Sequence, residues 1–245
     1  MKIEIFDTPP AVAGAAALLL EQVAVAGSGP VHVALSGGST PALLFDLLAS
    51  TWRERLPWGR IHLWWGDERC VPPDHPDSNY GMTLDRLLRH VALPEVQVHR
   101  MRGEDTPEAE AQRYEAELLV HLPLHEGWPR FALVFLGMGD DGHTASLFPG
   151  QEVWQAHAAA SCGVVSHPVS GQRRVTLTAP VLDHAAQTCF LVTGAGKAAR
   201  IAEILGRSEG YLRYPAARVQ PVEGQLHWLL DQAAASAWEK TQKAE

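Results

Sequence analysis

The chain has 245 residues, and its 28 acidic and 20 basic side chains give a formal net charge of −8. Hydrophobic residues make up 46% and charged residues 20%, which is typical of a folded domain and excludes an intrinsically disordered chain. The acidic balance also excludes a strongly basic nucleic-acid binder. We expect one domain over residues 1–245, because one large α/β domain uses a chain of this length.

The three cysteines, Cys70, Cys162 and Cys189, form no C-x-x-C motif, so we expect free thiols in a reducing compartment. The first residues lack the features of a signal peptide. The apolar stretch 11–26 is too short and too interrupted to cross a bilayer, which takes about 20 apolar residues. We therefore expect a cytoplasmic protein with no membrane or nucleic-acid partner.

Apolar runs and proline-marked helix starts predict an alternation of strands and helices along the chain. In chain order, the expected elements are strand 3–6, helix 11–26, strand 31–35, helix 40–50, strand 61–65, polar loop 66–77, helix 79–90, extended segment 96–101, helix 107–121, strand 131–136, strands 163–166 and 174–178, helix 180–186, strand 189–192, helix 196–205, strand 226–230 and helix 231–243.

The alternation predicts an α/β fold with a single doubly wound, mostly parallel sheet flanked by helices, similar to a Rossmann fold. The continuous apolar run at 131–136 fits a strand that is buried on both faces of such a sheet. Ligands bind beyond the carboxyl ends of the strands in this architecture. The loops that follow strands are therefore the candidate functional segments.

The first of these loops, residues 36–41, reads Ser-Gly-Gly-Ser-Thr-Pro and precedes a helix. Gly37 and Gly38 allow close backbone approach, the hydroxyls of Ser39 and Thr40 can bind phosphate oxygens, and a helix N-terminus attracts anions. The loop matches neither G-x-G-x-x-G nor G-x-x-x-x-G-K-[ST], so it predicts no dinucleotide or P-loop site. The alternative is a simple glycine turn capped by Thr40.

The second loop begins with Gly66-Asp67-Glu68-Arg69 directly after a strand. Carboxylates suit the recognition of a polar substrate, and the planar fork of Arg69 suits a carboxylate or a phosphate. Asp67 and Arg69 are therefore candidate binding residues. The alternative is a solvated, charged loop.

The third loop, residues 137–144, reads Gly-Met-Gly-Asp-Asp-Gly-His-Thr and follows the buried strand. His143 is a candidate general base, and Asp140 or Asp141 can orient its imidazole; the sequence does not decide between the two. Metal binding by the same three residues is a competing interpretation. The chain offers no further His or Cys at ligand spacing there, so we expect no metal. A capped turn with an incidental histidine is the other alternative.

Two further segments carry cations. Arg173 and Arg174 begin a predicted strand, and Lys197 follows Gly194-Ala195-Gly196 on a strand-to-helix turn. A lysine in the first turn of a helix opposes the helix dipole, which indicates a bound anion nearby. The alternative is a lysine that extends into water. Together, these loops indicate a small phosphorylated substrate and a proton transfer.

The same segments resemble the 6-phosphogluconolactonase family, within a wider group that includes glucosamine-6-phosphate deaminases. The matching blocks are VALSGGSTP at 33–41, GDER at 66–69, DSNY at 77–80, GMGDDGHTASLFPG at 137–150, RVTLT at 174–178 and GAGK at 194–197. The deaminase branch resembles GHIAFNEP in the fourth block, and Phe148 stands where its glutamate would be. This departure and the GDER block favour the lactonase branch.

The resemblance implies hydrolysis of 6-phospho-D-glucono-1,5-lactone in the oxidative pentose phosphate pathway, with no cofactor and no metal. It implies that His143 activates water, and that the phosphate lies on Gly38-Ser39-Thr40 with Lys197 and Arg174 opposite its charge. Arg174 is preferred to Arg173 because it precedes VTLT, and Arg69 could bind either the phosphate or the sugar hydroxyls.

The expected partner is the small sugar-phosphate lactone, and the expected assembly is a monomer or small homo-oligomer. There is no G-x-S-x-G elbow, so a triad built on Ser146 is not expected. The rival interpretations are a sugar-phosphate isomerase or deaminase, and a non-catalytic sugar-phosphate sensor.

Overall fold

A seven-stranded parallel sheet forms the centre of the protein, with the strand order β1-β12-β11-β8-β2-β3-β5. The structure, a computed structural model, describes residues 1–151 and 160–242. Every pairing in this sheet is parallel. The strands are β1 (Lys2–Phe6), β2 (Val31–Leu35), β3 (Ile61–Trp65), β5 (Val98–His99), β8 (Leu133–Leu136), β11 (Gln187–Val192) and β12 (Gln225–Asp231).

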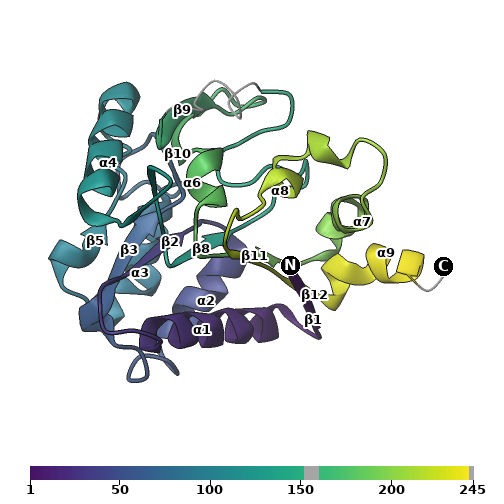
Figure 1. The fold of residues 1–245 in the computed structure, drawn as a ribbon, viewed down its shortest axis with the longest axis horizontal. Coiled ribbons are helices and arrows are strands. Elements are labelled where there is room, and N and C mark those ends of the chain that lie inside the picture. The colour runs from purple at the N-terminus through teal and green to yellow at the C-terminus, as the bar shows by residue number, and fades with distance from the viewer. Residues whose placement is uncertain (152–159, 243–245) are drawn as a thin grey trace.

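Helices cover both faces of the sheet (Figure 1). They are α1 (Pro9–Val25), α2 (Ser39–Ala49), α3 (Asn79–Arg86), α4 (Pro107–His121), α6 (Ala179–Asp183), α7 (Ala198–Leu205), α8 (Pro215–Arg218) and α9 (Gln232–Gln242). Successive strand residues point to opposite faces. Phe135 belongs to the buried cluster under α1 and α2, whereas Val134 belongs to the cluster under α4, α6 and α7. The predicted doubly wound α/β fold is therefore confirmed.

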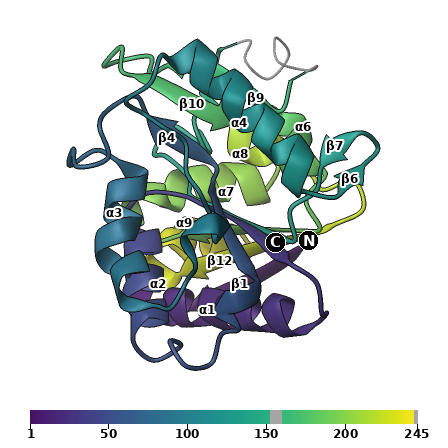
Figure 2. The same cartoon turned by 90° about the vertical axis from the view of Figure 1, so that its left-hand side faces the viewer.

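A second, antiparallel sheet lies beside the main one and consists of β4 (Asp67–Arg69), β10 (Arg173–Leu177) and β9 (Cys162–Ser166). Figure 2 shows β9 and β10 at the top of the molecule, away from the helices α1 and α2. Two expectations need correction: the strands predicted at 163–166 and 174–178 lie outside the parallel sheet, and the predicted polar loop 66–77 begins with a strand. The three-residue β4 is polar and too short to show a strand period.

Several element boundaries also differ from the prediction. Thr40 was expected as the N-cap and Pro41 as the first residue of the second helix, but α2 begins at Ser39 and its N-cap is Gly38. Gly38 has a φ of 107°, a backbone conformation that glycine adopts readily. Shorter elements carry too few residues for a periodic signal: the hairpin of β6 (Leu124–His125) and β7 (Trp128–Pro129), and the 3₁₀ turns η1 (Trp58–Arg60), η2 (Leu88–His90), η3 (Glu95–Gln97), η4 (Ala195–Lys197) and η5 (Tyr211–Arg213). The expected helix end at Lys243 lies outside the described residues.

The order of the strands reverses between β2 and β8. From β2 the chain continues outward through β3 and β5, whereas from β8 it continues in the other direction through β11 and β12. Such a reversal opens a crevice between the carboxyl ends of the two strands, where ligands bind in open α/β sheets. None of the helices in residues 1–151 and 160–242 combines the length and the apolar character that crossing a membrane requires.

Candidate active site

A pocket of about 190 Å³ lies at this strand reversal. Its lining combines the loops after β2 and β8 with the small antiparallel sheet and the first residue of α3. The lining residues are Ser36, Gly37, Gly38, Asp67, Arg69, Asn79, Gly137, Met138, Gly139, His143, Ala145 and Arg174. Five of the residues singled out in the sequence (Gly37, Gly38, Asp67, Arg69 and Arg174) thus surround one cavity together with His143.

His143 is held by its neighbour Asp141. Its Nδ1 lies 2.6 Å from Asp141 Oδ1, and its backbone N–H donates to the same oxygen at 3.1 Å. Burial tends to raise the pKa of Asp141, but the hydrogen bonds and charge of His143 outweigh it and bring that pKa below its usual value. With Nδ1–H donated to a charged carboxylate, Nε2 is the nitrogen left to accept a proton.

Asp140 makes a different contact. Its Oδ1 lies 2.5 Å from Nζ of Lys197, which follows β11 on the turn η4. The two adjacent aspartates therefore divide their roles: Asp141 contacts the histidine, and Asp140 contacts the lysine. This arrangement separates the three residues of the metal interpretation, because Asp140 points to an ammonium group and not to the imidazole.

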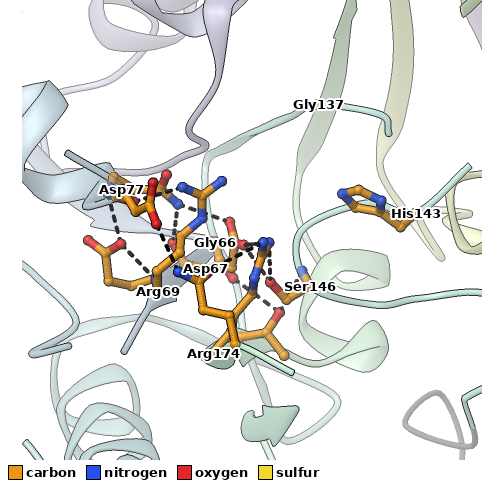
Figure 3. Close-up of polar contacts among 12 residues, drawn as sticks. Gly66, Asp67, Arg69, Asp77, Gly137, His143, Ser146 and Arg174 are labelled. Carbon is orange, nitrogen blue, oxygen red and sulfur yellow. Dashed lines mark hydrogen bonds and ion pairs between the residues drawn. The ribbon is translucent and has the colours of Figure 1, made fainter. Parts of the chain in front are cut away.

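Asp67 is the centre of a buried polar network that joins four segments (Figure 3). Its Oδ2 accepts a hydrogen bond of 2.6 Å from Ser146 Oγ and lies 3.9 Å from the Arg174 guanidinium. Asn79 donates from Nδ2 to the carbonyl of Asp67 at 2.8 Å. Gly37 packs closely against Asn79, since a Cβ on Gly37 would stand 1.8 Å from Asn79 Oδ1. These contacts fix the segment after β3 against the loop after β8, β10 and the start of α3.

Two arginines present unused hydrogen-bond donors at the pocket. Among the described residues, the buried Nε groups of Arg69 and Arg174 have no hydrogen-bond partner. Burial also lowers the pKa of Arg174, although Asp67 opposes that effect. Buried donors without partners are uncommon in folded proteins and call for a physical explanation. Both arginines line the pocket, so an anion or a polyhydroxylated molecule placed there can offer acceptors to their guanidinium groups.

Glu68 anchors the other side of this loop. The residue is 2% exposed, and its carboxylate accepts hydrogen bonds from the backbone N–H groups of Arg69, Asn79 and Tyr80 at 2.7–2.8 Å. Burial raises the pKa of Glu68 to about 6, although these hydrogen bonds oppose the shift. The sequence suggested an exposed charged loop here as an alternative, but Asp67 and Glu68 are buried.

Phe148 lies beside the catalytic candidate. Its ring centroid is 4.8 Å from that of His143, and the Arg174 guanidinium lies 5.6 Å from the same ring. The position that the deaminase pattern gives to a glutamate thus contacts the imidazole with an aromatic ring. A second carboxylate is therefore not available to His143 from this position.

Some residues fall elsewhere than the sequence suggested. Ser39, Thr40 and Lys197 lie outside the pocket lining, and the Thr40 hydroxyl is 2.7 Å from that of Thr193. This bond places the N-terminus of α2 next to the segment that leads to Lys197. The sequence analysis did not predict that Ser36 and Asn79 line the pocket or that Ser146 binds Asp67 beside it. For Asn79, its position in the DSNY block could have indicated a role in the site.

Gly139 should be sensitive to substitution, because a Cβ there would stand 2.1 Å from His143 Nδ1. We expect Gly139→Ala to displace the imidazole and lower kcat about 10-fold, since misplacement by about 1 Å costs up to about 10² in rate. Gly14→Ala in α1, where a Cβ meets no atom within 4 Å, is the matched control. Steady-state kinetics with melting curves test this; a Gly139→Ala enzyme of normal kcat would contradict it.

Comparison with known proteins identifies the family of the chain. The family model of glucosamine-6-phosphate isomerases and 6-phosphogluconolactonases matches residues 8–228. The chain is 44% identical over 206 residues to a 6-phosphogluconolactonase of Haemophilus influenzae, and the match covers 84% of this chain and 86% of that protein. The chain belongs to this family.

Within the family, the chain is an enzyme of the 6-phosphogluconolactonase type. Its structure matches that of 6-phosphogluconolactonase from Trypanosoma brucei with a TM-score of 0.83 at 30% identity, over 96% of this chain and 97% of that one. A monomeric glucosamine-6-phosphate deaminase matches with a TM-score of 0.78 at 21% identity, over 97% of this chain and all of the other. The second likeness shows a shared fold alone.

Proposed function

We propose that the protein hydrolyses 6-phospho-D-glucono-1,5-lactone to 6-phosphogluconate, with His143 as the general base. The contact between His143 Nδ1 and Asp141 carries the proposal, because it fixes the tautomer that leaves Nε2 free to accept a proton. The pocket position of His143, beside two arginines, supports the same assignment. The family membership supports the choice of substrate.

The reaction needs no covalent intermediate, because a lactone is an activated ester. His143 takes a proton from water while the water oxygen attacks the lactone carbonyl carbon. The tetrahedral intermediate then collapses, the bond from that carbon to the ring oxygen breaks, and the imidazolium returns the proton to the departing oxygen. General-base assistance of this kind contributes about 10²–10⁴ in rate.

Backbone N–H groups are the proposed stabilisers of the oxyanion. The N–H groups of Gly139 and Gly142 are already bonded within their own loop. In the described structure, no hydrogen bond engages the N–H groups of Gly37 and Gly38, and both residues line the pocket. We therefore assign the oxyanion to the loop after β2.

The substrate phosphate is assigned to the N-terminus of α2 and to Lys197. The Thr40–Thr193 contact supports this site, because it brings Ser39 at the start of α2 beside the turn that carries Lys197. A helix N-terminus and a lysine together suit a phosphate. Arg174 and Arg69 are assigned to the remaining substrate oxygens, with Arg174 closer to the buried Asp67.

Lys197→Ala is expected to raise KM for the phosphorylated lactone about 10-fold and to leave kcat nearly unchanged, because the lysine contacts a charge that is present throughout the reaction. Hydrolysis of unphosphorylated gluconolactone should not change. The control is Lys240→Ala on α9, away from the site. An equal loss toward both lactones would remove Lys197 from the phosphate site.

The activity itself is tested with freshly prepared 6-phosphogluconolactone, by measuring its loss above the spontaneous rate. The proposal expects fast, saturable hydrolysis and no ammonia release from glucosamine 6-phosphate. Ammonia release without lactone hydrolysis would favour the deaminase. Binding of the lactone without faster loss would favour the sensor. A cytoplasmic location and a monomeric or small homo-oligomeric state stay predictions.

A further inference from the structure

Four histidines gather on the face of the sheet that α4 covers, apart from the candidate active site. His32, His62 and His99 come from the adjacent strands β2, β3 and β5, and His121 is the last residue of α4. Neighbouring ring centroids in the series are 4.8, 5.3 and 4.9 Å apart, and Trp64 stacks on His99 at 3.9 Å. The proposed lactonase reaction uses none of these side chains.

Three side chains of this region bring metal-ligand atoms together. His99, Glu117 and His121 each offer one ligand atom, and these atoms lie within 4.8 Å of one another. Glu117 and His121 are four residues apart on α4 and so share one face of the helix. His99 Nδ1 and Glu117 Oε1 are 2.7 Å apart. Tetrahedral zinc, with bonds of about 2.0–2.2 Å, needs ligand atoms separated by about 3.3 Å, a value between the 2.7 Å contact and the 4.8 Å limit of this group.

The neighbours of the three residues match the outer contacts of known metal sites. In such sites, the second nitrogen of a histidine ligand and the second oxygen of a carboxylate ligand are held by hydrogen bonds. Here His99 Nε2 lies 3.0 Å from His62 Nδ1, and Arg113 pairs with Glu117 Oε2. When His99 donates its Nε2 proton to His62 Nδ1, its own Nδ1 is the nitrogen left to bind a metal.

We propose that His99, Glu117 and His121 bind one divalent transition-metal ion of the zinc class, which joins α4 to β5. Two imidazole nitrogens and one carboxylate oxygen suit zinc, cobalt or nickel and not magnesium or calcium, which prefer oxygen ligands. His99 is buried, Glu117 is half-buried and His121 is exposed, so an ion reaches the ligands from solvent. Three protein ligands leave one position for water.

A second group, His125, Glu126 and His184, also offers three ligand atoms within 4.8 Å of one another. It lies partly on the β6–β7 turn, where Glu126 adopts a φ of 51°. The first group is built on a 15-residue helix and a strand of the main sheet, which hold ligand positions more rigidly than a turn does. The proposal therefore commits to the first group, and the second supplies a control.

The test uses the full-length chain without an affinity tag, after removal of metal with a chelator. Calorimetric titration with Zn²⁺ should show one ion per chain, and Zn²⁺ should raise the melting temperature because it binds the folded state. Co²⁺ should give the visible absorption of a tetrahedral site. His121→Ala, a change at an exposed position, should weaken Zn²⁺ binding at least about 10-fold, the loss that even outer-contact residues cause.

His184→Ala and His143→Ala are the matched controls, and both should bind Zn²⁺ like the unchanged chain. Melting in the absence of metal verifies that each variant is folded. Failure of the unchanged chain to bind Zn²⁺ overturns the proposal, as does normal binding by His121→Ala. Loss of binding in His184→Ala or His143→Ala places the metal at the second group or in the lactonase pocket, and overturns it as well.

Discussion

Replacing His143 with alanine is expected to lower kcat at least about 10²-fold, because the variant loses the proton acceptor that activates water. KM should change little, since the phosphate contacts assigned to α2 and Lys197 stay in place. The side chain is 26% exposed, so its removal leaves a solvent-filled space and not a core cavity. Initial rates on fresh 6-phosphogluconolactone, corrected for spontaneous hydrolysis, measure the effect.

The control for this variant is His90→Ala, an exposed histidine at the end of η2, away from the pocket. Its kcat should equal that of the unchanged enzyme. Melting temperatures of both variants separate a chemical effect from loss of the fold. A His143→Ala enzyme with near-normal kcat would show that water is activated elsewhere and would remove His143 from the mechanism.

The second large effect is expected from Asp141→Asn, with a loss in kcat of about 10² or more. The asparagine keeps the size of the side chain but can donate its amide hydrogen to Nδ1 of His143. The proton of the imidazole then resides on Nε2, and the base is lost although the ring stays in place. In serine proteases, the same exchange of the orienting aspartate costs about 10⁴ for the same reason.

Asp140→Asn offers a matched comparison, because it removes the neighbouring carboxylate in the same loop. Asp140 contacts Lys197 at 2.5 Å, so its loss should alter KM for the phosphorylated lactone and leave kcat within about 3-fold. If Asp140→Asn lowered kcat more than Asp141→Asn does, the orienting role would belong to Asp140. The two variants thus decide a question that the DD pair in the sequence leaves open.

The sequence predicted the architecture because the signals of a parallel sheet are local. The apolar run at 131–136 predicts a central strand, and in the structure β8 spans Leu133–Leu136. The loop positions of Gly37, Gly38 and His143 followed from the rule that ligands lie at the carboxyl ends of strands. The pocket does lie there, although the assignment of chemical roles to its residues stays a prediction.

The parts that could not be predicted depend on contacts between distant residues. Asp67 and Ser146 are 79 positions apart, yet their side chains are 2.6 Å from each other. Thr176 of β10 pairs with Asp67 of β4 and accepts a hydrogen bond from the backbone N–H of Ser146, which brings Ser146 to Asp67. A three-residue polar strand such as β4 has no period that would reveal this pairing in the sequence. The sequence likewise does not decide which of Asp140 and Asp141 contacts His143. The two aspartates are adjacent and chemically identical, and only the folded structure determines that Asp141 contacts His143 and Asp140 contacts Lys197.

The parallel pairing of β1 with β12 imposes an order on folding. Within the described part of the chain, β1 pairs with no other strand, and its partners, residues 227–231, lie more than 220 positions later in the chain. During synthesis, the first strand must therefore wait for almost the whole chain to emerge, whereas β2, β3 and β8 can pair much earlier. The two strands that border the crevice, β2 and β8, can consequently pair before the sheet is complete. Pairing with β12 is the step that finally docks β1.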